Sequence, residues 1–199
     1  MILNGSALNT GPINGEIELS LRSICDIARM RIESDLQLAL AVPVQLGSID
    51  HRALDQARAW RRKYHRLGLQ EREPGWDWKD EFYTRSRRSS YIDLAIWSEH
   101  TLCGLMIGQV SDGRVNATIH FIESDPELNP LKGEIIDIVT RFLEAIAALV
   151  GCEHALISKP IPDLIERYKS FGYTEEKRKR RTVTALIKRL PDSALSDHA

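Results

Sequence analysis

The sequence has few of the residues that would indicate a disulfide-stabilised, metal-binding or membrane-spanning protein. Its three cysteines, Cys25, Cys103 and Cys152, form no Cys-x-x-Cys pair and no other zinc pattern. They stand in apolar sequence, which favours reduced core thiols in a cytoplasmic protein and no metal site. No stretch approaches the roughly 18 apolar residues of a membrane span, and no basic region followed by an apolar run opens the chain. We therefore expect neither a membrane helix nor a secretory signal.

The charge of the chain is nearly balanced, with 27 lysine and arginine residues against 28 aspartate and glutamate residues. A net charge of −1 neither indicates nor excludes a nucleic-acid partner for the chain as a whole. Hydrophobic residues make up 43% of the sequence and charged residues 28%, so a chain of 199 residues can bury a sizeable core. These values predict one domain with, at most, an appendage.

We interpret residues 1–35 as an N-terminal appendage. Residues 1–17 are rich in asparagine and glycine, which predicts a loose lead-in. Apolar residues at helical spacing then predict a helix over residues 20–35. The following run, residues 36–46, is mostly apolar, and its β-branched residues favour a strand. Pro43 would place that strand at the edge of a sheet.

A second helix is predicted to begin after Asp50, a candidate N-cap, and to end at Gly68. One face of this helix is apolar. The other face carries five cations: Arg58, Arg61, Arg62, Lys63 and Arg66. Such a face is either solvated or attracts an anionic ligand or substrate.

Residues 71–90 read as irregular structure around Pro74-Gly75-Trp76-Asp77-Trp78. Two tryptophans in a charged loop are unusual, because their large apolar surface is normally buried. Trp76 and Trp78 therefore either fasten the loop to the core or line a substrate pocket.

Three strands in an antiparallel meander are predicted from residue 91 onwards. Residues 91–97 alternate, and residues 102–110 are apolar on both faces, which is typical of a central strand. Ser111-Asp112-Gly113 is a hairpin signal. The next strand places Val115, Ala117, Ile119 and Phe121 on one face and Asn116, Thr118 and His120 on the other.

The stretch 119–173 carries the features most informative about function. A strand over residues 119–123 is followed by a loop over 125–131 and then by Lys132-Gly133-Glu134. A helix N-terminus presents unpaired N–H groups that can hold phosphates, and glycine lets the backbone approach a ligand closely. This order suggests a nucleotide-cofactor site.

A broad apolar stripe predicts a helix between Gly133 and Gly151 that packs flat on the sheet. A helical crossover of this kind pairs the strand over 154–158 parallel to the strand before it. The remaining expected elements are a helix, a strand that closes the sheet and a polar tail, over residues 162–172, 182–190 and 191–199.

This order of elements resembles the GNAT superfamily of N-acetyltransferases, over residues 36–190. The resemblance is carried by Thr101-Leu-Cys-Gly-Leu-Met-Ile-Gly, by the strand, loop and helix over 119–150, and by Tyr168-Lys-Ser-Phe-Gly-Tyr173, which is similar to the family's Tyr-x-x-x-Gly-Phe ending. It implies an α/β (α+β) fold with a mixed, mostly antiparallel, V-splayed sheet flanked by helices, here with an extra N-terminal helix. The loop Pro130-Leu-Lys-Gly133-Glu-Ile135 departs from the family's Arg/Gln-x-x-Gly-x-Gly/Ala.

The resemblance also implies that the chain binds acetyl-CoA as a co-substrate. In the family, the pantetheine lies along the strand that matches Phe121 and Ile122, up to Glu123. The pyrophosphate sits on the helix start that matches Leu131, Lys132, Gly133, Glu134 and Ile135. The tyrosine that matches Tyr168 lies near the cofactor sulfur and can protonate the departing thiolate.

Direct attack of an amine on the thioester also needs a base that deprotonates the ammonium group. We favour Glu123, at the end of the strand where the acyl group should lie, and place His120 second. The candidate substrate contacts are Trp76 and Trp78. Each of these residues could instead be purely structural.

The sequence therefore predicts a cytoplasmic acetyl-CoA-dependent N-acetyltransferase that acts on a primary amine of a small molecule or protein, with a homodimer left open. One alternative is a GNAT-fold binding or regulatory protein with weakened catalysis, which the departures over 130–135 favour. Another is a toxin-like enzyme that acetylates aminoacyl-tRNA. The basic run over 177–181 favours it, but the near-neutral charge does not. An acyl-homoserine lactone synthase ranks lower, because the early Arg-x-x-Val-Phe signature of that family is not evident.

Overall fold

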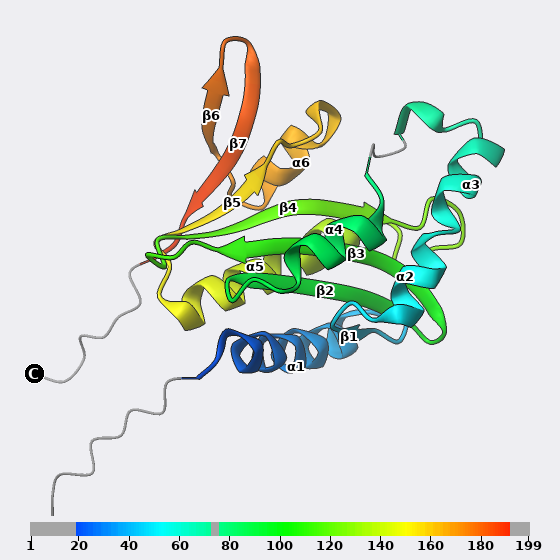
Figure 1. Ribbon diagram of the computed structural model, residues 1–199, viewed down its shortest axis with the longest axis horizontal. Helices are drawn as coiled ribbons and strands as arrows, with labels where there is room; N and C mark the ends of the chain where they lie inside the picture. Colours follow the sequence, from blue (N-terminus) through cyan, green and yellow to red (C-terminus); the bar gives the residue numbers. More distant parts are fainter. Residues whose placement is uncertain (1–18, 73–75, 192–199) are drawn as a thin grey trace, which may run out of the picture.

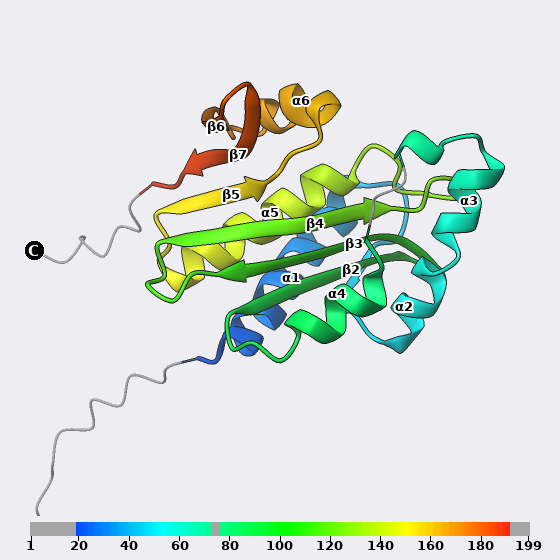
Figure 2. The same cartoon turned by 45° about the horizontal axis from the view of Figure 1, so that its top comes forward.

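Helices cover both faces of a central β-sheet in the computed structural model, which describes residues 19–72 and 76–191 (Figures 1 and 2). Seven strands form this sheet in the order β1-β2-β3-β4-β5-β7-β6. Among the described strands only β4 and β5 run parallel, so the expected mixed, mostly antiparallel sheet is confirmed. No helix in the described ranges is both long and apolar enough to cross a bilayer. The predicted lead-in over 1–17, Pro74, Gly75 and the tail beyond Pro191 lie outside the described residues.

The predicted meander is confirmed as β2 (Tyr91–Ser98), β3 (Thr101–Val110) and β4 (Asn116–Ser124). A short edge strand, β1 (Gln45–Gly47), pairs with β2. The strands β3 and β4 approach each other closely at Gly108. A Cβ atom there would lie 2.4 Å from the carbonyl oxygen of Thr118, so this position requires glycine.

The strands β4 and β5 (His154–Ser158) are paired over only part of their length. Residues 116–119 of β4 lie opposite residues 154–157 of β5, whereas β4 continues to Ser124. Within the described residues, no strand pairs with this edge of β4 beyond Ile119. Figures 1 and 2 show the two strands starting together and then diverging. The expected parallel pairing and splayed sheet are therefore confirmed.

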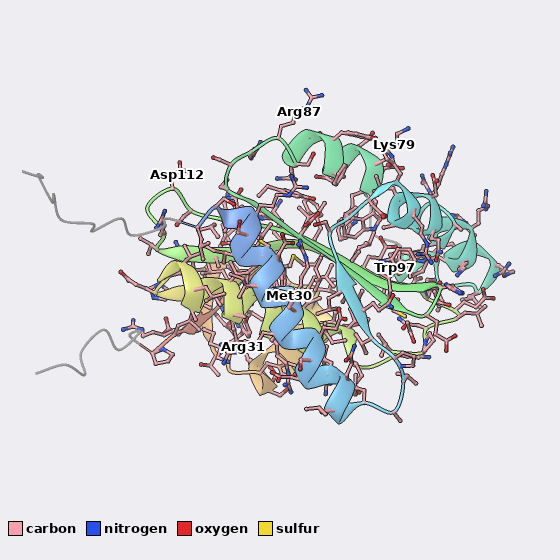
Figure 3. All side chains as sticks on the ribbon, turned by 90° about the horizontal axis from the view of Figure 1, so that it is seen from below. Met30, Arg31, Lys79, Arg87, Trp97 and Asp112 are labelled. Carbon is pink, nitrogen blue, oxygen red and sulfur yellow. The ribbon has the colours of Figure 1, made fainter. Side chains whose placement is uncertain are left out.

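One face of the sheet is covered by α1 (Leu21–Ala39) and α5 (Ile135–Val150), and α1 crosses it in Figure 3. Ser20 caps α1, because its hydroxyl accepts a hydrogen bond from the Ser23 amide at 3.2 Å. Buried residues follow one stripe of α1: Cys25, Ala28, Ile32 and Leu36. The predicted strand over 36–46 is wrong for most of its length. Leu36 lies one helical turn after Ile32 and keeps the chain helical as far as Ala39.

A buried ion pair fastens α1 to the sheet. The guanidinium of Arg29 donates to the carboxylate of Asp93 in β2 at 2.7 Å and to the Asp93 carbonyl at 2.8 Å. The Asp93 carboxylate also accepts from the amide of Ile49 at 2.9 Å. Both side chains are buried. The helix assigned to the N-terminal appendage thus contributes apolar and charged groups to the same core as the strands.

The opposite face of the sheet is covered by α2 (His51–Ala57), α3 (Trp60–Arg66) and α4 (Trp78–Arg85). Asp50 caps α2, as predicted, by accepting from the Ala53 amide at 2.8 Å. The single helix expected up to Gly68 is wrong, because the chain tightens at Ala59, whose amide bonds to Gln56 three residues earlier.

The irregular structure expected over residues 71–90 is wrong for the helical residues 71–72 and 78–85 and right for residues 86–90, which form turns. A short 3-10 helix, η1 (Gln70–Arg72), comes first, and α4 begins after Asp77. The carboxylate of Asp77 accepts from the amides of Lys79 and Asp80, at 2.8 and 3.2 Å. This N-cap stabilises the first turn of a helix that also carries acidic residues there, as the helix dipole favours.

The chain ends in η2 (Pro162–Leu164), α6 (Ile165–Ser170), β6 (Glu175–Lys179) and β7 (Thr182–Arg189). The predicted helix that Pro162 opens and Gly172 follows is confirmed. The strand predicted over 182–190 is present as β7, which pairs with β5. It does not close the sheet as predicted, because β6 forms the outer edge, and most of the basic run over 177–181 lies on this edge strand.

Candidate functional site

β4 carries a bulge at His120, where the strand leaves β5. Ile119 lies opposite Gly108 of β3 and Phe121 lies opposite Ile107, which makes His120 the extra residue. The bulge turns the following side chains over. Ile119 lies in the core beneath α1 and α5, whereas Phe121 packs with the core beneath α2, α3 and α4. The prediction that Phe121 shares a face with Ile119 is therefore wrong, because strand alternation does not continue through a bulge.

The imidazole of His120 is partly buried in a positively charged environment. Its Nε2 atom is buried and has no hydrogen-bond partner among the described residues. Burial lowers the pKa of His120 from its ordinary value, and the charges of Arg85, Arg88 and Lys159 lower it further, against the opposite effect of Glu81. His120 is therefore neutral at neutral pH, with a ring nitrogen able to accept a proton.

An aromatic cluster lies on the α4 side of the sheet beside Glu123. The ring of Trp76 is 5.1 Å from that of Phe121 and 6.5 Å from that of Trp78, in edge-on contacts. Trp78 is buried, and its Nε1 donates to the buried carboxylate of Glu123. The indole Nε1 of Trp76 is buried without a partner in the described part of the chain. The structure thus gathers these four predicted site residues together.

The loop before α5 leaves the helix start open at Gly133. This residue has φ of +96°, and a Cβ atom added to it would meet no atom within 4 Å. Its carbonyl accepts a hydrogen bond from Arg167 of α6 at 3.2 Å. The next residue, Glu134, precedes α5 without a side-chain cap, so no side chain from this position occupies the first amide groups.

Ile135, at the start of α5, packs into the sheet. It is buried, and a Cβ atom added to Gly104 of β3 would lie 3.1 Å from its Cδ1 and Cγ2 atoms. The absence of a side chain at Gly104 is what makes room for Ile135. The bulky residue that replaces the family's small one is thus directed toward β3, while Lys132 and Gly133 stay exposed.

Two residues of the connecting loop, unnoticed in the sequence, fix its path. Asp125 is buried and forms an ion pair with Lys63 of α3. Asn129 donates to the carbonyl of Cys103 and accepts from the amide of Leu131, both at 2.9 Å. A further ion pair joins Glu127 of the loop to Arg66 of α3. Lys63 and Arg66, two of the five cations predicted either to be solvated or to attract an anionic ligand, thus pair with this loop instead. Asn129 directly before Pro130 is a sequence pattern typical of an Asx turn, and it could have indicated the role of this residue.

Tyr168 lies on α6, on the far side of the splay from the aromatic cluster. It is buried in the same core as Leu131 and Ile135. Burial raises the pKa of Tyr168 to about 12, so its hydroxyl keeps its proton at neutral pH. The predicted residues therefore form two groups. His120, Phe121, Glu123, Trp76 and Trp78 lie on the α4 side, and Ile122, Tyr168 and the residues 131–135 lie toward α5 and α6.

The described arrangement, a mixed sheet whose parallel β4–β5 pair splays apart, has the same fold as solved GNAT N-acetyltransferases. An acetyltransferase from Thermus thermophilus is similar with a TM-score of 0.56 and 14% identity, over 74% of this chain and 97% of its own. PaiA N-acetyltransferase from Thermoplasma acidophilum, solved in complex with coenzyme A, has a TM-score of 0.53 and 13% identity, over 74% of this chain and 99% of its own.

A third similar structure is a chimera of the spermidine N-acetyltransferase SpeG from Vibrio cholerae and hSSAT. Its TM-score is 0.53 at 14% identity, over 73% of this chain and 94% of its own. No protein-family model matches the sequence, and neither does any curated protein. The chain thus has the GNAT fold, and identities this low establish the fold rather than the substrate.

Proposed function

We propose that this chain is an acetyl-CoA-dependent N-acetyltransferase that transfers an acetyl group to a primary amine. The observation that supports this most is the departure of β4 from β5 after Ile119, which leaves an open strand edge next to the start of α5. One similar structure was solved with coenzyme A. The open loop at Gly133 and the inward side chain of Ile135 fit a pyrophosphate there.

In this proposal the two groups of residues have separate roles. The open edge of β4 at Phe121 and Ile122 would hold the pantetheine. The pyrophosphate would be held by the backbone amides of Gly133 and Ile135 and by Lys132, because the amides of Leu131, Lys132 and Glu134 already donate within the loop. Acetyl-CoA, when bound, supplies the thioester carbon that the amine attacks. The weakened-catalysis alternative loses support, because Ile135 packs against β3 instead of filling the phosphate position.

Two residues of β4 can take the proton of the acceptor's ammonium group, and their contacts favour His120. Its Nε2 has no partner among the described residues and its lowered pKa keeps it neutral, so this buried nitrogen can take up a proton that a water molecule relays from the amine. The carboxylate of Glu123 already accepts a hydrogen bond from Trp78, which suits positioning the amine. We therefore assign the base to His120 and amine positioning to Glu123, the reverse of the order that the sequence favoured.

The ammonium group first loses one proton to His120. The amine nitrogen then bonds to the acetyl carbon and the carbon–sulfur bond breaks. The hydroxyl of Tyr168 donates a proton to the thiolate that leaves. The nitrogen loses its second proton, which returns through water to Tyr168 once that hydroxyl has protonated the thiolate. The raised pKa of Tyr168 keeps the hydroxyl protonated at neutral pH, so its proton is available when the thiolate forms, while the same shift makes the hydroxyl a weaker acid.

Calorimetric titration of acetyl-CoA tests the cofactor site. Gly133→Glu should weaken binding by about 100-fold, equivalent to about 2.7 kcal/mol, because it places a negative charge and a strained backbone where phosphates bind. Gly151→Glu is the matched control. Gly151 also has a positive φ, +79°, and no atom lies within 4 Å of its Cβ position, but it ends the same helix. The proposal would be contradicted if the wild type did not bind acetyl-CoA at millimolar concentration, or if both variants lost the same affinity.

Removal of the Tyr168 hydroxyl tests the proton donor. Tyr168→Phe should lower kcat by about 10- to 100-fold, since a thiolate leaves fairly easily without full general-acid help. The affinity for acetyl-CoA should stay unchanged. Tyr173→Phe is a suitable control, because it removes a similarly buried hydroxyl from the same segment. A full rate in Tyr168→Phe would rule out the assigned role.

A further inference from the structure

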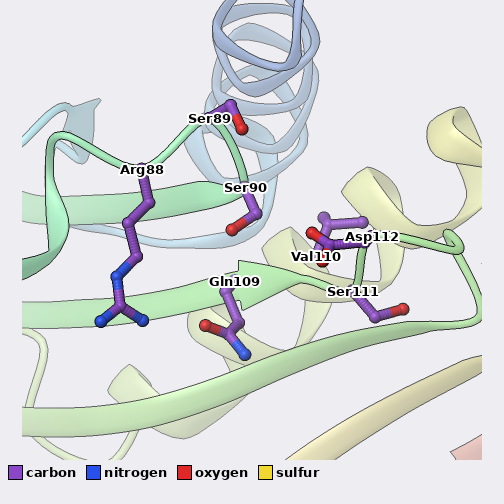
Figure 4. Close-up of a pocket in the computed structure, with 7 residues that line it drawn as sticks. All are labelled: Arg88, Ser89, Ser90, Gln109, Val110, Ser111 and Asp112. Atoms are coloured by element: carbon purple, nitrogen blue, oxygen red, sulfur yellow. The ribbon is translucent and has the colours of Figure 1, made fainter.

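A polar pocket of 580 Å³ opens on the α4 face of the sheet (Figure 4). Its lining includes Arg88, Ser89 and Ser90, from the turn before β2, and Gln109 and Ser111, from the end of β3 and the turn after it. Arg88 reaches down beside Gln109 in Figure 4. The acidic residue of the lining, Asp112, lies with Ser111 away from Arg88. The end nearest Arg88 is thus rich in hydrogen-bond donors and positive charge.

The pocket adjoins the proposed catalytic base along the strands. Gln109 lies opposite Thr118 on β4, and Thr118 is two residues before His120. Gln109 also lies opposite Tyr91, which packs with the core beneath α2, α3 and α4. The pocket, His120 and the aromatic cluster therefore share one face of the sheet.

Three cations from three parts of the chain act on this region. Arg85 of α4 forms an ion pair with Glu81 at 2.8 Å, and its guanidinium lies 4.8 Å from the centre of the Phe121 ring. Arg88 and Lys159 also act electrostatically on His120. Arg88 is exposed and makes no ion pair among residues 19–72 and 76–191, so its charge is not neutralised by that part of the fold.

A positive region beside the base selects among amines. It opposes an acceptor with a second ammonium group, and it attracts one with a negative group. A guanidinium also offers a planar fork of N–H donors that matches the oxygens of a carboxylate or a phosphate. Neutral donors from the serines and from Gln109 can complete such a site.

We propose that the acceptor is a primary amine that also carries a carboxylate or phosphate group, and that Arg88 binds this negative group in the pocket. This inference rests on the proposed acetyl transfer and narrows its substrate class. It separates the chain from an enzyme for polyamines, although the similar SpeG chimera is named as a spermidine N-acetyltransferase.

The test compares matched amines in an assay of thiol release from acetyl-CoA. O-Phosphoethanolamine is paired with ethanolamine, γ-aminobutyrate with butylamine, and spermidine represents a polycation. The wild type should prefer the anionic member of at least one pair, and the pair that shows it distinguishes phosphate from carboxylate. Arg88→Gln should raise KM for that amine by about 10-fold or more, the cost of one charge-assisted hydrogen bond. Arg87→Gln is the control, because Arg87 is exposed and points away from the protein (Figure 3).

A preference for spermidine or for the neutral amines, or an equal loss on all amines in Arg88→Gln, would overturn the inference. Its failure can be told apart from failure of the acetyl transfer. If acetyl-CoA does not bind, the proposed function fails, and the anion site is then tested alone by titrating O-phosphoethanolamine and γ-aminobutyrate while following the His120 ring by NMR. A ring shift that Arg88→Gln abolishes and Arg87→Gln retains supports the site. No shift in the wild type rejects it.

Discussion

His120→Gln is expected to lower kcat/KM for the acceptor amine by about 10²- to 10⁴-fold, the usual contribution of a general base. The affinity for acetyl-CoA should not change. The dependence of kcat/KM on pH distinguishes a general base from a residue with a structural role. Because the pKa of His120 is lowered, the wild-type base is unprotonated at neutral pH, and its contribution disappears only on the acid side as the ring takes up a proton. The variant should lack this acid limb.

Glu123→Gln provides the comparison. If Glu123 positions the amine, its variant should lose rate mainly through a higher KM and should keep the acid limb that belongs to His120. If instead Glu123→Gln removes the limb and His120→Gln keeps it, the two roles are exchanged. A His120→Gln enzyme with wild-type kcat/KM would exclude His120 as the base.

Arg29→Met should lower the free energy of unfolding by about 3–5 kcal/mol, because it leaves a buried carboxylate without its cation. Of its hydrogen bonds in the described part of the chain, Asp93 would keep those from the Ile49 amide at 2.9 Å and from the Tyr91 hydroxyl at 3.3 Å. Urea unfolding followed by circular dichroism measures the change. The predicted size is large for a single charged residue of a covering helix, and it follows from the burial of both partners.

Two further variants make the result interpretable. Arg31→Met removes an exposed charge from the same helix and should change stability by less than about 0.5 kcal/mol. Adding Asp93→Leu to Arg29→Met removes the uncompensated charge and should restore part of the loss. A loss below about 1 kcal/mol in Arg29→Met would show that water or rearrangement satisfies Asp93.

The elements that sequence predicted well are those whose apolar pattern matches one local period. β2, β3 and β4 alternate or are apolar throughout, and α5 has a broad helical stripe between Gly133 and Gly151. The break between α2 and α3 was hidden, because Ala53, Ala57, Trp60 and Tyr64 are all buried on both sides of it. The start of α4 is indicated by Asp77 followed by Asp80 and Glu81, but Pro74-Gly75 just before it is typical of a loop.

The candidate site residues could be named from the sequence, whereas their arrangement in space could not. His120 and Glu123 could be named because they are titratable residues of the predicted strand β4. Trp76 and Trp78 could be named because they are large apolar residues in a charged segment. The bulge at His120 depends on how β4 pairs with β3, which no local pattern in β4 reveals. The same holds for Asp125 and Asn129, because their partners on α3 and β3 are distant in sequence. The roles proposed here follow from these long-range contacts.

The four residue pairs between β4 and β5 join the two parts of the splayed sheet, here called plates. The plate with β1 to β4 holds His120, and the plate with β5 and α6 holds Tyr168. Under the proposed roles, the distance between proton acceptor and proton donor is set by how these plates meet. Ala117 and Ala155 lie opposite each other in that ladder and are fully buried. A larger side chain at either position would change the angle between these two parts of the sheet. The distance between His120 and Tyr168 can therefore be altered by a residue that contacts neither acetyl-CoA nor the amine.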